Sequence, residues 1–543
     1  MSSAVPKSWG RFASPLWMAT WLLASAAVAA PPPSGPAASP ATAPAAAPAS
    51  AVAKPGGPVP AAKAGGTASA PASAAPVKKE KPIPPPPPDT FDRALAAHYR
   101  SDYVEAARDF YWVLATSPQT ADNYPWAMYF LALDLESLGF TQAAIAYQVT
   151  VAKDRIKPEI LPLALKAIER MVDQVPFDED LVIRELLYGT DFGKVPDEFN
   201  DFVEFYRGFV DYTDGRIRWG DEHFAKLSPG SRYDYRAREI KAVHRLRAKD
   251  DLPGALGEFD ALAGDAKAPI QVRNDARLDA ARLEYEEKNF DKALVDYDSV
   301  ELPQLHPGRG EIYLERAWIF YRLLDPSRAY GFLTALDAPS FRGLFLPEKF
   351  LLRGLIYKDK CHYLSAKRAA REFSRRYHAT LESIKARDDL EKDPRLKAAA
   401  LDSGPAQKAE ARYDVITKER DDVNRYASPF ATPGLTAKLH EIYDLMGAEA
   451  ERRRNILFDR ALDNTADRFL RADENLRLLD YEIGLDIYRR IKRGDRKKAL
   501  ALEDAPPVTG EVVYPFTGEY WNDELRSLRF FLKSRCLEIE GEE

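Results

Sequence analysis

Apolar and small residues recur at helical spacing through most of the chain. In the segment "SDYVEAARDFYWVLATSP" (101–118), Ala106 is followed four residues later by Phe110. The same pairing recurs further along the chain as Ala255 with Phe259 and as Ala293 with Tyr297. Positions four apart lie on one face of an α-helix. Each pair therefore predicts a helix whose small residue allows a close approach and whose aromatic ring fills the groove beside it.

The key alanines also recur at a nearly constant distance along the chain. Ala255, Ala293, Ala329 and Ala366 are separated by 38, 36 and 37 residues. A period in this range is typical of a solenoid of stacked helix pairs, in which no pair buries its apolar face alone. We expect an all-α fold with a helical-hairpin solenoid over 89–375.

The repeat resembles the tetratricopeptide repeat in its loose form. A small residue in the first helix, a glycine before the turn and an alanine in the second helix mark that family, as Ala132, Gly139 and Ala144 do here. The match covers roughly 90–375, although 157–200 fits only as generic helix pairs. The resemblance implies that the first helix of each pair lines a concave surface.

By this register, aromatic and basic residues fall on the concave side of four successive repeats. They are Phe209, Tyr212, His244, Arg247, Arg282, Tyr285, Trp318, Tyr321 and Arg322. Aromatic residues and arginine dominate binding hot spots, so these positions predict a groove for a partner protein. The alternative is that about half of the aromatic side chains pack between helices.

Residues 376–505 lose the repeat but keep apolar residues at helical spacing. We expect two long antiparallel helical stretches there, like a coiled-coil arm, separated by "ASPFATPG" (427–434). "LDSGPAQ" (401–407) suggests an interruption in the first stretch. The basic run "RRIKRGDRKK" (489–498) fits either contact with an acidic partner or lipid headgroups, or a solvated helix end.

The C-terminal segment 506–543 is short and aromatic. Pro515 and Gly518 exclude a continuous helix, whereas Asn522 can cap a short one. Leu525, Leu528 and Leu532 would then share one face, with Phe531 beside them, and would need a surface to cover.

The chain contains two cysteines, Cys361 near the turn of the last recognisable repeat and Cys536 in the C-terminal segment. We predict a disulfide between them that holds the segment on the solenoid. Two separate buried thiols are the alternative.

The first 88 residues contain two segments of different composition. Residues 1–29 read as a secretory signal peptide, with Lys7 and Arg11 ahead of the apolar run "PLWMATWLLASAAVAA" and a cleavage site after Ala29. An uncleaved membrane anchor is the alternative. Residues 30–88 are rich in proline and alanine, which predicts a disordered tether. We therefore expect a periplasmic protein with no membrane span after cleavage.

Charge and motifs bear on the class of function. The net charge of −6 argues against a nucleic-acid binder. The sequence has no H-E-x-x-H, G-x-S-x-G, glycine-rich phosphate loop or EF-hand loop, and its seven histidines are scattered. We expect no catalytic residues, no metal site and no cofactor, and hence a binding protein.

A second resemblance combines the signal peptide, the tether, the repeats and the segment "YPFTGEYWNDELRSLRFFLKSRC" (514–536). Together they resemble the tetratricopeptide-containing envelope proteins of the adventurous gliding motility (Glt) machinery. No cysteine directly follows the apolar run, so the match is to the soluble periplasmic type rather than the lipid-anchored type. The resemblance implies a scaffold whose partners are envelope proteins such as outer-membrane barrels or lipoproteins. A glycan- or peptidoglycan-binding accessory protein is the alternative.

Overall fold

The structure is a computed structural model that describes residues 83–154, 157–193, 195–387, 389–402, 404–492, 520, 524–530 and 532–536. Every regular element within these residues is helical. The expected signal peptide (1–29), most of the expected tether (30–88) and residues 493–519 lie outside them.

The first half of the solenoid consists of helices that pack on one another in succession. They are α2 (Thr90–Tyr99), α3 (Tyr103–Thr116), α4 (Tyr124–Ser137), α5 (Thr141–Asp154), α6 (Leu161–Gln174), the π-helix η2 (Asp180–Tyr188), the short 3₁₀-helix η3 (Asp197–Phe199), α7 (Asn200–Thr213) and α8 (Ile217–Phe224). The segment that fitted only generic helix pairs is the one where η2 takes the place of a second α-helix.

The second half continues in the same way with four regular pairs. They are α9 (Arg232–Lys249) with α10 (Leu252–Gly264), α11 (Ile270–Glu286) with α12 (Phe290–Asp298), α13 (Gly308–Arg322) with α14 (Pro326–Ala335), and α15 (Glu348–Asp359) with α16 (Tyr363–Arg376). The predicted all-α hairpin solenoid is confirmed.

Small residues set how closely the paired helices approach. The alanines that define the period are fully buried, as are Phe110 and Phe259. Between α7 and α8 glycine takes the role of alanine, because a Cβ on Gly208 would lie 2.5 Å from the Phe224 ring. Several second helices also begin at an aspartate N-cap, as at Asp251, whose carboxylate accepts from the Gly254 N–H at 3.0 Å. The repeat is therefore specified by both packing residues and helix-capping residues.

Residues after α16 form α17 (His378–Ala386), η4 (Leu390–Lys392), α18 (Pro394–Leu401), α19 (Gly404–Asp422), η5 (Val423–Tyr426) and α20 (Leu435–Lys492). The first expected long stretch is thus several helices rather than one. Besides the expected interruption near 403, it breaks before Pro394, where Asp393 caps α18 through the N–H groups of Arg395 and Leu396. The second stretch is a single helix of 58 residues, about 87 Å long at 1.5 Å per residue.

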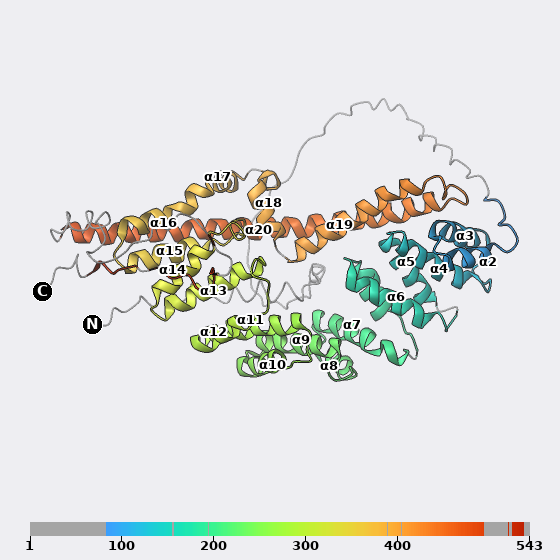
Figure 1. Ribbon diagram of the computed structural model, residues 1–543, viewed down its shortest axis with the longest axis horizontal. Coiled ribbons are helices and arrows are strands. Elements are labelled where there is room, and N and C mark those ends of the chain that lie inside the picture. Colours follow the sequence, from blue (N-terminus) through green and yellow to red (C-terminus); the bar gives the residue numbers. More distant parts are fainter. Residues whose placement is uncertain are drawn as a thin grey trace, which may run out of the picture.

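The long helix α20 is not a free arm, because it packs on both ends of the solenoid (Figure 1). Its first half joins the core of the early repeats through Leu435, Leu439 and Tyr443. Its second half joins the core of α15 and α16 through residues such as Phe469 and Leu479.

Ion pairs reinforce these contacts at both ends. The Arg453 Nη1 lies 2.8 Å from the Asp180 Oδ2, and the Lys358 Nζ lies 2.6 Å from the Glu482 Oε2. In Figure 1 the repeats form an arc from α2–α5 to α13–α16, and α20 runs from one end of the arc to the other. The helix therefore bridges the two ends of the arc.

The described residues of the C-terminal segment cover α14, but not as the expected helix. Residues 524–527 form a turn and the described residues of 528–535 are not helical, while Asn522 and Phe531 lie outside the described residues. Main-chain groups bond to the solenoid instead: the Phe530 N–H donates to the Ser327 carbonyl at 3.1 Å. Leu525 is 1% exposed within the core of α13 and α14.

A disulfide closes this attachment. Cys361 and Cys536 are bonded in the structure, with an S–S distance of 2.14 Å across a sequence separation of 175. Near the bond, the Arg535 N–H donates to the Lys360 carbonyl at 3.1 Å. We call residues 524–536 the strap.

Candidate partner-binding surface

The nine residues predicted to line the groove lie on the first helices α7, α9, α11 and α13, and several of them contact a neighbouring first helix. Between α7 and α9, the Tyr212 and His244 rings meet edge to face with centroids 5.4 Å apart. Burial raises the pKa of Asp279 on α11, and the guanidinium of Arg247 on α9 is one of the charges that oppose this shift. We call the side of these helices that faces away from α8, α10, α12 and α14 the inner surface.

Arg282 is the central cation of this surface. Its Nε lies 3.0 Å from the Glu315 Oε1 on α13, and its Nη1 lies 3.7 Å from the Asp279 Oδ1 on its own helix. All three side chains are about 14% exposed or less. An arginine held between two carboxylates has fewer donors free for a ligand, so Arg282 serves to join α11 to α13.

The contacts continue to α15 through α13. Burial raises the pKa of Tyr285, while the nearby guanidinium of Arg322 opposes that shift. The Tyr321 hydroxyl donates to the Asp359 Oδ2 at 2.6 Å, and the Trp318 and Tyr321 rings meet edge to face with centroids 5.9 Å apart. These contacts place five of the predicted residues around the α11–α13–α15 junction.

Two of the predicted aromatic residues serve mainly in packing. Phe209 lies against the core of the early repeats. Tyr212 stacks on Phe224 with centroids 5.1 Å apart, and its ring occupies the space where a Cβ on Gly220 would stand. For these residues the packing alternative describes the structure better than the groove.

The inner surface also carries acidic residues that the sequence interpretation passed over. Their side chains are only partly exposed, and they lie between the residues described above: Glu239 on α9, Asp275 and Asp279 on α11, and Glu311 and Glu315 on α13. We call these five residues the acidic row. The available signal was their spacing, since Asp275–Asp279 and Glu311–Glu315 are each four apart and like charges at that spacing are unfavourable in an isolated helix.

Burial changes the protonation of the acidic row. It raises the pKa of Glu239 to about 8, with the charges of Asp275 and Asp279 adding to the shift. It likewise raises the pKa of Glu311 to about 8, of Asp279 to about 7 and of Asp275 to about 6. Several of these carboxyl groups are therefore partly protonated at pH 7, because burial disfavours their charged form.

These shifts predict how stability depends on pH. A carboxyl group whose pKa is raised in the folded state stabilises the fold fully below its unfolded pKa, and this contribution is lost as pH rises through the folded pKa. We expect the free energy of unfolding to fall between about pH 5 and pH 8, and Glu239→Gln with Glu311→Gln to reduce that fall by at least ~1 kcal/mol. Urea unfolding of the wild type and the double variant at pH 5, 6, 7 and 8 measures these free energies of unfolding. Parallel curves for the two proteins would contradict the prediction.

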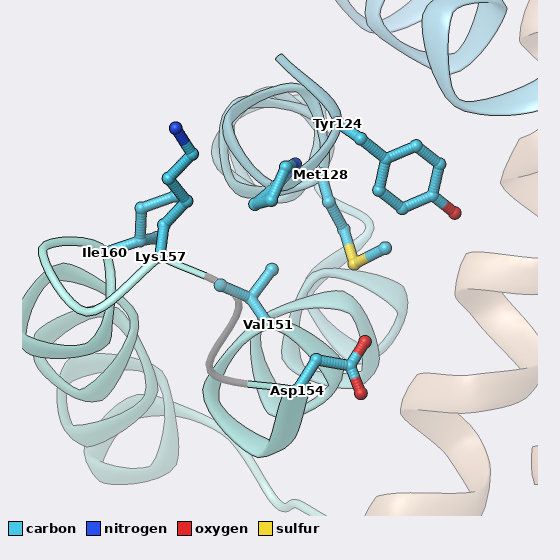
Figure 2. Close-up of a pocket in the computed structure, with 7 residues that line it drawn as sticks. Tyr124, Met128, Val151, Asp154, Lys157 and Ile160 are labelled. Carbon is cyan, nitrogen blue, oxygen red and sulfur yellow. The ribbon is translucent and has the colours of Figure 1, made fainter. Parts of the chain in front are cut away.

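A separate shallow pocket lies between α4, α5 and the start of α6, and it offers little chemistry (Figure 2). It is lined by Tyr124, Pro125, Met128, Val151, Asp154, Lys157 and Ile160. It has room for about one water molecule at most. The Lys157 Nζ pairs with the Asp122 Oδ1 at 3.1 Å, outside the pocket lining.

The fold and the inner surface define this chain as a helical-hairpin solenoid protein whose two ends are joined by one long helix. No protein-family model, curated protein or solved structure matches the chain. Among the described residues, no helix combines the length and apolar character needed to cross a bilayer. Within the same residues, no three His, Cys, Asp or Glu side chains are grouped as a metal site.

Proposed function

We propose that this protein is a non-catalytic scaffold that binds partner proteins along the inner surface of α7–α13. The observation that carries the proposal is the set of aromatic and charged side chains that link the successive first helices α9, α11 and α13 to one another and to α15. Aromatic and arginine side chains on a rigid concave surface are suited to protein recognition.

The cellular setting in this proposal comes from the sequence. The signal-like residues 1–29 and the Pro/Ala-rich residues 30–88 favour the periplasm, where the Cys361–Cys536 disulfide would also be stable. The resemblance to the Glt proteins favours a cell-envelope assembly, with gliding motility as the process and outer-membrane barrels or lipoproteins as the partners.

The glycan-binding alternative requires solvent-exposed aromatic faces on which sugar rings can stack. Trp318, the tryptophan of the groove, lies partly buried against the core of α13 and α14 and beside Tyr321. This placement favours a protein partner. A pull-down with purified cell wall separates the two functions, because saturable binding that is lost in Trp318→Ala would favour the glycan.

Photo-crosslinking in cells tests the scaffold function directly. We expect a photoreactive amino acid at position 247, exposed on the inner surface, to capture a discrete set of envelope proteins that mass spectrometry can identify. The matched control places it at Val295, which is 63% exposed on the second helix α12. Co-expressing an excess of the same protein without the photoreactive amino acid should suppress the adducts from position 247. The same adducts from both positions, or none from position 247, would refute the proposal.

A further inference from the structure

The turn between α15 and α16 differs from earlier turns of the solenoid. In several hairpins a residue with a positive φ lies two positions before the second helix, namely at Ser101, Gly139, Gly215, Asp250, Lys288, Leu324 and Cys361. At Asp102, Asp251 and Asp325 the next residue is an aspartate whose side chain caps that helix. His362 takes this place after Cys361, and its side chain makes no capping hydrogen bond. The last turn therefore lacks the local cap.

The strap uses both residues of this turn instead. Cys361 forms the disulfide with Cys536. The His362 Nε2 lies 2.8 Å from the Lys533 carbonyl oxygen, and because a carbonyl group only accepts, the imidazole donates this hydrogen bond. The turn is therefore suited to holding the C-terminal end of the strap rather than to capping α16.

The two sulfur atoms of the disulfide have different surroundings. Cys361 is 6% exposed, and its Sγ accepts a hydrogen bond from the Tyr363 hydroxyl at 3.4 Å. Cys536 is the more exposed of the two cysteines. A disulfide is cleaved when a thiolate attacks one sulfur and the other sulfur leaves as a thiolate. An incoming thiolate therefore reaches the Cys536 sulfur, and Cys361 is the leaving group.

The surroundings of Cys361 also favour its departure as a thiolate. Hydrogen bonds to charged acceptors are stronger than those to neutral ones, so the bond from the Tyr363 hydroxyl strengthens as negative charge develops on the Cys361 Sγ. Cys361 directly precedes the N-cap of α16, and the positive end of a helix dipole stabilises an anion. A more stable leaving thiolate makes a disulfide faster to reduce.

We infer that the Cys361–Cys536 disulfide is a reducible latch that a dithiol opens in a fixed direction. One thiolate of the dithiol attacks the Cys536 Sγ and forms a mixed disulfide, while the bond between the two cysteines breaks and Cys361 leaves with its electron pair. The second thiolate of the dithiol then displaces Cys536. The dithiol is thereby oxidised to a disulfide, and its two protons pass to the released cysteine sulfurs. This inference goes beyond the proposed scaffold function and does not depend on it.

Opening the latch frees one end of the strap. The disulfide and two hydrogen bonds with the α15–α16 turn hold residues 533–536. Leu525 and Phe530 are held by α13 and α14 instead. Reduction therefore loosens residues 533–536 while Leu525 and Phe530 stay in place.

The rate of reduction in Tyr363→Phe tests the role of Cys361 as the leaving group. We expect dithiothreitol to reduce the disulfide of the folded protein at least ~3-fold more slowly in this variant than in the wild type, because the thiolate loses its hydrogen bond. If the hydroxyl served only to hold the turn, its loss would loosen the turn and speed reduction. An equal or faster rate in Tyr363→Phe therefore overturns the inference. Tyr235→Phe is the matched control, since it removes a hydroxyl that donates to the Asp265 Oδ2 at 2.9 Å in another repeat, and it should be reduced at the wild-type rate.

Mapping the mixed disulfide tests the direction of attack in the wild type. The purified oxidised protein is incubated with glutathione, treated with N-ethylmaleimide and digested for mass spectrometry. We expect the glutathione adduct mainly on Cys536 and the maleimide on Cys361, because the thiolate attacks the more accessible sulfur. A glutathione adduct found equally or mainly on Cys361 would contradict the assigned direction.

Hydrogen exchange tests whether reduction opens the latch. After reduction, the Arg535 N–H, which is bonded to the Lys360 carbonyl, should exchange at least ~10-fold faster, and the Phe530 N–H should change less. Unchanged exchange at Arg535 would show that the disulfide does not control the end of the strap, and the latch would be refuted.

Discussion

Replacing Tyr443 by alanine should release α20 from the early repeats. The Tyr443 ring is fully buried, and its hydroxyl donates to the Glu419 Oε2 on α19 at 2.7 Å. The same carboxylate oxygen accepts from the Gln142 N–H of α5 at 2.9 Å, so three elements meet at one carboxyl group. Removing a buried aromatic ring costs about 3–5 kcal/mol, and here it also takes a donor from a buried carboxyl group.

The expected readout is the shape of the molecule as well as its stability. Release of α20 at this end opens the arc, so the radius of gyration from small-angle scattering should rise and the amides of α5 should exchange faster. Phe259→Ala is the matched control, because Phe259 is fully buried in a core formed by α9, α10 and α11 rather than by α20. It should lower the free energy of unfolding by a similar amount without changing the radius of gyration. Equal radii of gyration for Tyr443→Ala and Phe259→Ala would show that α20 does not maintain the shape of the arc.

Tyr443→Phe isolates the hydrogen bond from the packing. Burial raises the pKa of Glu419 to about 7, and the hydrogen bond from Tyr443 opposes this shift. Removing the hydroxyl should therefore raise the pKa of Glu419 further and cost about 1–3 kcal/mol where the carboxylate is charged. The loss should be larger at pH 8 than at pH 5. A larger loss of stability at pH 8 than at pH 5 would identify Glu419 as the group whose ionisation causes the loss.

The repeats were predictable because the signals that specify them are local. An alanine followed four residues later by an aromatic residue indicates packing between two helices that are adjacent in the chain. Ala255 and Phe259 are both buried, as expected. The break between α19 and α20 could likewise be predicted from Pro429 and Pro433. Such features depend on a few neighbouring residues and need no knowledge of the whole fold.

The attachment of α20 to the early repeats could not be predicted in this way. Arg453 pairs with Asp180, 273 residues earlier, and both look like ordinary surface charges in the sequence. Part of the acidic row was missed for the same reason, since Glu239 comes near Asp275 and Asp279 only when α9 packs beside α11. Long-range contacts of this kind have no period to reveal them.

The strap shows how one pattern can support two structures. Leu525, Leu528 and Leu532 have helical spacing, whereas Leu528, Phe530 and Leu532 alternate as in an extended chain. The structure uses the second pattern: Leu528 and Leu532 lie against the core of α13 and α14, and Phe530 meets Tyr330 with centroids 5.5 Å apart. The solenoid supplies hydrogen-bond partners to the strap, so the segment need not form a helix to satisfy its backbone.

Gly331→Ala should lift the strap from α14 while leaving the disulfide in place. A Cβ on Gly331 would lie 1.8 Å from the Leu528 carbonyl oxygen, which is backbone and cannot turn away as a side chain would. Alanine favours the helix itself by up to about 1 kcal/mol, so α14 should persist and the strap should move. Displacement exposes Leu525, whose burial contributes on the order of 2 kcal/mol.

Hydrogen exchange measures this displacement at a named group. The Phe530 N–H, bonded to the Ser327 carbonyl, should exchange at least ~10-fold faster in Gly331→Ala, since each 1.4 kcal/mol of lost protection is a factor of ten. Gly257→Ala is the matched control, because a Cβ on that helical glycine meets nothing within 4 Å. Reduction of the Cys361–Cys536 bond should then free the strap entirely in Gly331→Ala but only loosen it in the wild type, where the main-chain bonds and Leu525 remain. Unchanged protection of Phe530 in Gly331→Ala would mean that α14 yields instead of the strap.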